Sequence, residues 1–225
     1  MGQKLGKLDS SSIESSSLKP ISLRYGVVLT GGIACGKSSV GEILRARGFE
    51  IICADSIAHC VLEECARELI DTFGEGIASI DPNDLGIINR KALGEIVFSD
   101  PAKRTLLESI THPRIHAQII AKACELEARK RWYFLDIPLF FESGGRAHYG
   151  VDIVVCVSAK EELQLARLMQ RNALSLSQAQ ARVRAQMPLE QKIAQSDIVI
   201  DNNGTLAALE SKVDLCCALL LHRFA

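Results

Sequence analysis

Short apolar runs alternate along the chain with longer segments of helical periodicity. Runs with the length of buried strands occupy residues 25–29, 49–53, 132–136, 152–157 and 197–201. Between them the pattern predicts helices, including one over 37–47 that stops at Gly48 and a last one over about 205–221. Strands separated by helices form a parallel, doubly wound sheet. The expected fold is therefore α/β, a five-stranded parallel sheet flanked by helices.

Two longer segments and the N-terminus depart from this alternation. Residues of about 60–130 are mostly helical and are expected to form an insert, in which Asp100 and Pro101 mark a helix start. The helical segment 160–195 is richer in Arg and Gln than the rest. The first 24 residues contain two serine triplets and little that could pack, so we expect a disordered tail before one domain over 25–225.

Composition excludes several functional classes. The 225 residues include 26 Lys and Arg against 27 Asp and Glu, and a net charge of −1 disfavours a nucleic-acid binder. No apolar segment approaches the roughly 20 residues that cross a bilayer, so no membrane partner is expected. The eight cysteines contain no C-x-x-C pair. A reduced, cytoplasmic protein, monomeric or weakly oligomeric, is the simplest interpretation.

A phosphate-binding loop is the clearest chemical motif. Gly31-Gly32-Ile33-Ala34-Cys35-Gly36-Lys37-Ser38 matches G-x-x-x-x-G-K-[ST] and lies between a predicted strand and a predicted helix. Backbone N–H groups of such a loop close around phosphate oxygens, and the helix N-terminus adds its dipole. Lys37 is expected to reach the β- and γ-phosphates of ATP, and Ser38 to hold Mg²⁺. The expected ATP-binding residues are Gly31, Gly32, Ala34, Cys35, Gly36, Lys37, Ser38 and Ser39.

A second acidic signal narrows the class of phosphate-loop protein. Asp136 ends an apolar strand, where a carboxylate can orient Mg²⁺ indirectly. Ile137 follows it, where motor-type ATPases usually have a glutamate, and no Asn-Lys-x-Asp motif of GTPases occurs. A small-molecule kinase remains, with a nucleotide-binding regulatory protein as the rival from another class.

A kinase also needs a base near the acceptor and a lid over the reacting groups. Asp55 directly follows the second strand and is the best candidate base, although it could also cap its helix. His59, one helical turn later, could face the cleft or pack. In the segment 160–195, Arg167 and Arg171 share a helix face and could clamp the transferred phosphoryl group, or could lie on an ordinary solvated helix.

From about residue 25 to its C-terminus, the chain resembles the dephospho-CoA kinase family. The resemblance rests on the following motifs: Gly31-Gly32-Ile33 before the phosphate loop, Ala54-Asp55, Arg90 with Leu93-Gly94, His112-Pro113, the run from Asp136 to Glu142, Gln186-Met187-Pro188, and the run from Asp197 to Gly204. The phosphate loop occurs in many families, whereas its combination with His112-Pro113 and the 136–142 run is far more specific.

This resemblance implies an activity and a role for each segment of the chain. It implies transfer of the ATP γ-phosphate to the ribose 3′-hydroxyl of dephospho-CoA, with Asp55 as the catalytic aspartate. The family's P-loop kinase fold would place its substrate-binding insert at about 60–130 and its lid at about 160–195. Asn203 would lie near the ATP adenine. His59, Arg90 and His112 are the further substrate-side candidates, His112 either as a substrate contact or as a structural hydrogen-bonding group.

Three local features carry further expectations. Ala34 stands where the family commonly has glycine, which requires a negative φ at this residue. Cys35 is either a backbone contributor or a thiol activated by the helix N-terminus. Cys53 lies beside the candidate base. Together, Cys35 and Cys53 predict that thiol alkylation inactivates the kinase and that bound ATP protects it.

Two patterns that resemble metal sites are rejected. His112 and His116 lack a third ligand for a metal ion, and the calcium-like stretch 81–92 fails at two ligand positions.

Overall fold

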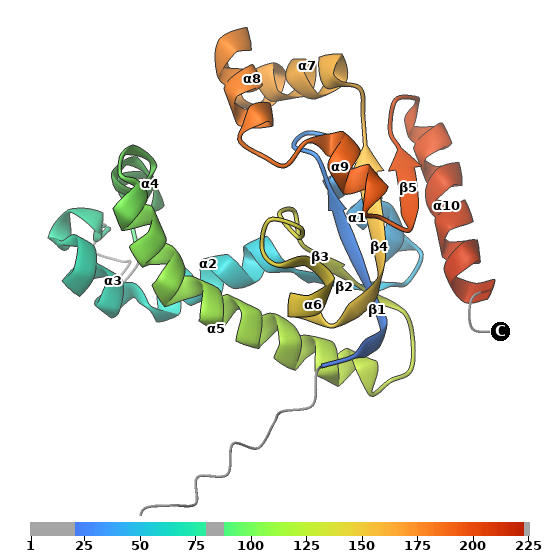
Figure 1. The fold of residues 1–225 in the computed structure, drawn as a ribbon, viewed down its shortest axis with the longest axis horizontal. Coiled ribbons are helices and arrows are strands. Elements are labelled where there is room, and N and C mark those ends of the chain that lie inside the picture. The colour runs from blue at the N-terminus through green and yellow to red at the C-terminus, as the bar shows by residue number, and fades with distance from the viewer. Residues whose placement is uncertain (1–20, 80–87, 223–225) are drawn as a thin grey trace, which may run out of the picture.

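The computed structural model describes residues 21–79 and 88–222, which form a five-stranded, all-parallel sheet with helices on both sides (Figure 1). The strands are β1 (Leu23–Gly31), β2 (Glu50–Cys53), β3 (Tyr133–Asp136), β4 (Val151–Ser158) and β5 (Ile198–Asp201). Their spatial order is β2-β3-β1-β4-β5. The predicted α/β class, strand number and parallel orientation are confirmed.

β1 lies at the centre of the sheet and begins earlier than the sequence suggested. Leu23 is buried, and its N–H donates to the Gly150 carbonyl at 2.7 Å. The predicted boundary at residue 25 was therefore two residues late, because the polar Arg24 interrupts the apolar run. Of the tail expected over residues 1–24, residues 1–20 lie outside the described residues, whereas Leu23 and Arg24 belong to β1, so the expectation was wrong for these two.

Alternating residues of β1 face two separate apolar layers. Val28 packs with a cluster built from α2 (Ala54–Glu64), α3 (Ala66–Phe73) and α5 (Pro101–Glu127). Val27 and Leu29 pack with the other cluster, which includes α1 (Lys37–Ala46) and α10 (Leu206–His222). This period of two is what a strand buried on both faces requires. The packing fixes the carboxyl end of β1, where the phosphate loop begins.

The described residues between β2 and β3 are mostly helical, as predicted for about 60–130. It consists of α2, α3, the 3₁₀ turn η1 (Glu75–Ile77), α4 (Arg90–Ser99) and the 27-residue α5. Asp100 caps α5 as expected, because its carboxylate accepts from the Ala102 and Lys103 N–H groups. In Figure 1 the outer part of this insert, with α3 and α4, projects away from the sheet. The calcium-like residues 81–87 lie outside the described residues.

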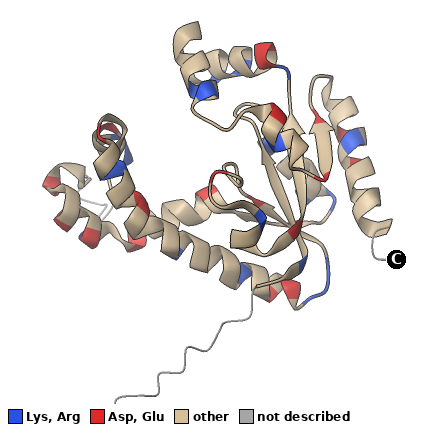
Figure 2. Ribbon diagram, viewed as in Figure 1, with Lys and Arg blue, Asp and Glu red and all other residues tan. Residues whose placement is uncertain are grey.

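The segment 160–195 is also helical and lies over the carboxyl ends of the strands (Figure 1). It contains α7 (Glu161–Asn172), α8 (Leu176–Arg184) and α9 (Leu189–Ala194), while the short α6 (Gly145–Tyr149) precedes β4. Figure 2 shows basic positions on the helices of this lid, most visibly on α8 and α9. Among the described helices, none is both long and apolar enough to cross a membrane.

Candidate active site

A pocket of about 520 Å³ opens at the carboxyl ends of the strands, where α/β folds bind ligands. Segments far apart in the sequence form its walls. The lining residues are Gly31, Gly32, Ile33, Ala34, Cys35, Gly36, Lys37, Ser38, Asp55, Pro138, Arg167, Gln170, Arg171 and Gln186. The structure therefore brings the predicted phosphate loop, the candidate base and both lid arginines to one cavity.

The phosphate loop is held by its own turn and by the residue that follows β5, Asn202. Gly36 has φ +91° and caps α1, and a Cβ there would lie 2.2 Å from the Asn202 amide nitrogen, so only glycine fits. That same nitrogen donates to the Cys35 carbonyl at 2.9 Å. Asn202 is buried, and its hydrogen bond to Cys35, 167 residues away in the sequence, holds the loop in its curved shape.

Ala34 contradicts one expectation. Its φ is +57°, not negative, so an alanine adopts the left-handed conformation that favours glycine. The Arg167 guanidinium donates to the Ala34 carbonyl at 3.2 Å and helps to hold this conformation. A left-handed alanine costs about 1–2 kcal/mol relative to the right-handed form.

We expect Ala34→Gly to stabilise the protein by about 0.5–1 kcal/mol, because relief of this cost exceeds the extra entropy of glycine in the unfolded chain. Urea unfolding measures the change. The matched control is Ala181→Gly in the middle of α8, which should destabilise by about 0.5–1 kcal/mol. A loss of stability from Ala34→Gly would contradict this account of the loop.

The Lys37 ammonium forms an ion pair with the Asp136 carboxylate in the structure. Asp136 ends β3 and is largely buried, while Lys37 lines the pocket at the start of α1. The two motifs that indicated a nucleotide site are therefore in direct contact. Ser38, the next residue of α1, lines the same pocket.

Asp55 lies in the first turn of α2 and lines the pocket together with the phosphate loop. The helix cap is Cys53, with no side-chain capping bond, so the interpretation of Asp55 as a helix cap is wrong. The carboxylate is exposed and available to the pocket.

The two lid arginines differ in their contacts. Arg167 donates to the Ala34 and Asn202 carbonyls at 3.2 and 3.1 Å, which joins the lid to the loop. Arg171, one turn later on α7, is exposed and donates only to the neighbouring Asn172 side chain among the described contacts. Arg171 is thus the freer of the two guanidinium groups that line the pocket.

Several predicted site residues lie outside the pocket lining. These are Ser39, His59, Arg90, His112, Asp136 and Asn203. His59 is exposed on α2, so the alternative that it packs in the interior is wrong. Asn203 accepts from the Lys160 N–H at 2.7 Å and so anchors the start of the lid.

A histidine not singled out from the sequence joins the predicted pair. The His148 ring lies 3.9 Å from that of His116, centroid to centroid, and the His148 carbonyl is 2.9 Å from His116 Nε2. Burial, together with repulsion from His116 and His112, lowers the pKa of His148. Among the residues that the structure describes, no three His, Cys, Asp or Glu side chains are grouped so that they could hold a metal ion.

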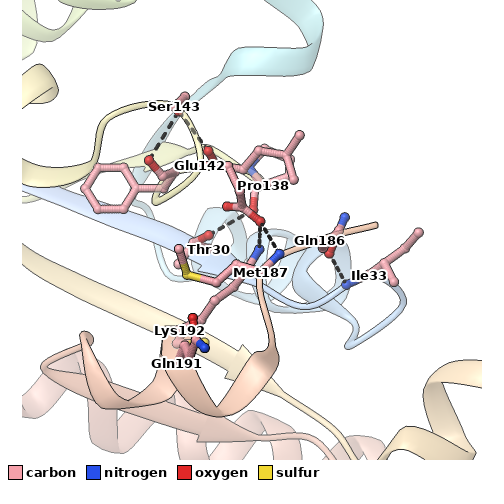
Figure 3. Close-up of polar contacts among 12 residues, drawn as sticks. Thr30, Ile33, Pro138, Glu142, Ser143, Gln186, Met187, Gln191 and Lys192 are labelled. Carbon is pink, nitrogen blue, oxygen red and sulfur yellow. Dashed lines mark hydrogen bonds and ion pairs between the residues drawn. The ribbon is translucent and has the colours of Figure 1, made fainter. Parts of the chain in front are cut away.

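The pair Glu142–Lys192 is a further feature that sequence reasoning missed (Figure 3). Lys192 belongs to α9 of the lid, but it is fully buried, with its ammonium 2.8 Å from the Glu142 carboxylate. Burial alone would raise the pKa of Glu142, but hydrogen bonds from Lys192 and from the Met187 N–H outweigh burial and lower it. The pair joins the loop after β3 to the segment between α8 and α9.

Glu142→Gln is expected to lower the free energy of unfolding at pH 7 by about 2–4 kcal/mol, because it leaves a buried ammonium without its counter-ion. Since the folded-state pKa of Glu142 is depressed, the wild-type advantage is complete above the ordinary carboxyl value of 4.5. This difference in the free energy of unfolding should disappear as pH falls below that value. Denaturation curves of both proteins between pH 7 and 3 measure the difference. A difference that grows toward acid pH would contradict the prediction.

The thiol hypothesis fails for Cys35. Its side chain is buried, and burial raises its pKa to about 11, so the helix N-terminus does not activate it. Its contribution to the loop is the backbone carbonyl that Asn202 binds. Cys53 is partly exposed but does not line the pocket.

We therefore expect iodoacetamide to modify the exposed Cys60 and Cys124 at least about tenfold faster than Cys35 in the native protein. Enzymatic activity should survive this labelling, and ATP should not change the pattern. Peptide mass spectrometry of timed samples gives the rates, and denatured protein provides the control in which all thiols react. Fast modification of Cys35 that ATP blocks would restore the original hypothesis.

The parallel sheet, the phosphate loop at its centre and the cationic lid define a P-loop kinase. The family model for dephospho-CoA kinase matches residues 25–208. The chain belongs to the dephospho-CoA kinase family.

Individual relatives agree with this assignment. A dephospho-CoA kinase of Helicobacter hepaticus is 43% identical over 192 residues, which are 85% of this chain and 91% of the relative. One of Carboxydothermus hydrogenoformans is 45% identical over 82% of this chain and 89% of its own length. The structure of a Campylobacter jejuni dephospho-CoA kinase superposes with a TM-score of 0.64 at 33% identity, covering 88% of this chain and 98% of that one.

Proposed function

We propose that the enzyme transfers the γ-phosphate of ATP to the ribose 3′-hydroxyl of dephospho-CoA and so forms coenzyme A, the last step of its biosynthesis. One observation carries this proposal: Asp55 lines the same pocket as the phosphate loop and the lid arginines. The names of the relatives support the identity of the acceptor.

Asp55 acts as the base in this proposal. Its exposed carboxylate can accept the proton of the acceptor hydroxyl as the oxygen attacks the γ-phosphorus. The leaving group is ADP, and the phosphoryl group passes to the ribose oxygen. Because Asp55 does not cap α2, its oxygens are free for this role.

Lys37, Arg167 and Arg171 offset negative charge on the transferred group. Lys37 exchanges its contact with Asp136 for phosphate oxygens, while Arg167 is already fixed against the loop. Arg171 supplies the more exposed guanidinium. Such preorganised cations stabilise charge that develops in the transition state.

Mg²⁺ fits the donor set at the loop. Ser38 offers a hydroxyl and Asp136 a carboxylate, which are the hard oxygen ligands that Mg²⁺ prefers. Bound there, the ion would neutralise phosphate charge, with Ser38 as a direct ligand and Asp136 acting through water. We assign no other metal to the site.

The remaining substrate contacts stay predictions. His59, Arg90 and His112 lie on or beside the helical insert, which in this proposal binds dephospho-CoA, and Asn203 lies at the adenine side. The lid over 160–195 closes on the reacting groups and excludes water as a competing acceptor.

A coupled ADP-release assay with several acceptors tests the proposal. We expect turnover with dephospho-CoA, little with AMP, UMP or shikimate, and none with dephospho-CoA that lacks the ribose 3′-hydroxyl. Chelation of Mg²⁺ should abolish turnover, and added Mg²⁺ should restore it. Binding of ATP without turnover of any acceptor would favour the regulatory alternative, and preferred turnover of AMP or UMP would indicate a nucleotide kinase.

A further inference from the structure

Gln186 connects the lid to the phosphate loop through its side chain. It lies in the segment between α8 and α9, and its side-chain oxygen accepts a hydrogen bond from the Ile33 N–H at 3.0 Å (Figure 3). The contact spans 153 residues of sequence. Both residues line the pocket that contains Lys37.

The chemistry of this contact fixes the orientation of the carboxamide. A backbone N–H can only donate, so the atom that faces Ile33 must be the oxygen of Gln186. The –NH₂ group therefore points elsewhere. Within residues 21–79 and 88–222 it makes no hydrogen bond, while its residue lines a cavity rich in phosphate-binding groups.

The backbone next to Gln186 is anchored as well. The Met187 N–H donates to the Glu142 carboxylate at 3.0 Å, and the buried Lys192 holds that carboxylate at 2.8 Å (Figure 3). Gln186 is thus positioned from the phosphate loop on one side and from the loop after β3 on the other. A donor held this way needs little reorganisation to meet a ligand.

We propose that the Gln186 –NH₂ group donates a hydrogen bond to the terminal phosphate of ATP. The amides of such a loop close around the inner phosphates, and its lysine reaches the outer ones. Ile33 lies in the turn that opens the loop, where the Cys35 N–H donates to the Gly32 carbonyl at 3.2 Å. Gln186 is bound to this turn and lines the same pocket as Lys37, so its –NH₂ group would meet the outermost phosphate, the one that is transferred. This inference rests on the proposed function, since it takes the pocket to hold ATP.

A purely structural alternative assigns Gln186 only to tying the lid down. Gln186→Glu separates the two, because a carboxylate still accepts from the Ile33 N–H but has no donor for a phosphate. Gln186→Met removes both groups without adding charge.

Isothermal titration calorimetry with ADP and with a non-hydrolysable ATP analogue provides the test. Losing a hydrogen bond to a charged phosphate should weaken binding of the ATP analogue by roughly 10- to 100-fold in Gln186→Glu and in Gln186→Met. Binding of ADP, which lacks the terminal phosphate, should change by less than about threefold in both variants. Equal weakening of both nucleotides would overturn the proposal, and so would unchanged affinity for the analogue.

Gln170→Glu is the matched charge control, since Gln170 lines the same pocket on α7 and, among the described residues, makes no side-chain hydrogen bond to the loop. Its effect on the analogue should be clearly smaller than that of Gln186→Glu. An equal effect would show that charge in the pocket, not the lost donor, is responsible, and would overturn the proposal. Failure here is distinguishable from failure of the proposed function, because wild-type turnover of dephospho-CoA would persist.

Discussion

Asp55→Asn is expected to lower kcat by about 10²–10⁴-fold, the usual contribution of a positioned general base. Affinity for ATP should stay near that of the wild type, because Asp55 comes from α2 and not from the phosphate loop. The substitution preserves size, and the residue makes no helix-capping bond, so the fold should not change. Steady-state kinetics with dephospho-CoA, together with ATP binding by calorimetry, measures the two effects.

The control for this prediction is Glu63→Gln, which removes one negative charge from the same helix at an exposed position outside the pocket. Its kcat should equal that of the wild type. A near-normal kcat in Asp55→Asn with ATP bound would show that another group, or no group, takes the proton. A loss of ATP affinity in parallel with kcat would instead assign Asp55 to the nucleotide site.

The local parts of the site were predictable because their signals are local. A glycine-rich loop between a strand and a helix places Lys37 and Ser38 at a helix N-terminus whatever the rest of the fold does. Asp55 and Asp136 could be placed for the same reason, since each directly follows or ends an apolar strand and strand ends meet at one edge of a parallel sheet.

The supporting contacts could not be predicted because they join distant segments. Asn202 reaches Cys35 and Gln186 reaches Ile33 across more than 150 residues. Lys192 resembled any other lid lysine, and only the packing of α9 against β4 shows that it is buried. The left-handed Ala34 is also a tertiary effect, because contacts from Arg167 and Asn202 hold the loop against alanine's own preference.

Lys37→Met is expected to lower kcat by about 10²–10³-fold, because it removes a preorganised cation from the transferred phosphate. The same change should reduce the free energy of unfolding without nucleotide by about 1–3 kcal/mol, since it leaves the largely buried Asp136 carboxylate without its partner. Coupled kinetics and urea unfolding measure these two consequences of one substitution.

The double variant Lys37→Met/Asp136→Asn separates the two roles. Removing both charges should restore most of the lost stability, because no unpaired carboxylate remains beneath the loop. Activity should stay low, since neither the cation for the phosphate nor the carboxylate that orients Mg²⁺ is present. Recovery of activity together with stability would mean that Lys37 acts only through the ion pair with Asp136. If the single variant lost no stability, the pair would contribute nothing to the empty enzyme, and Lys37 would serve the phosphate alone.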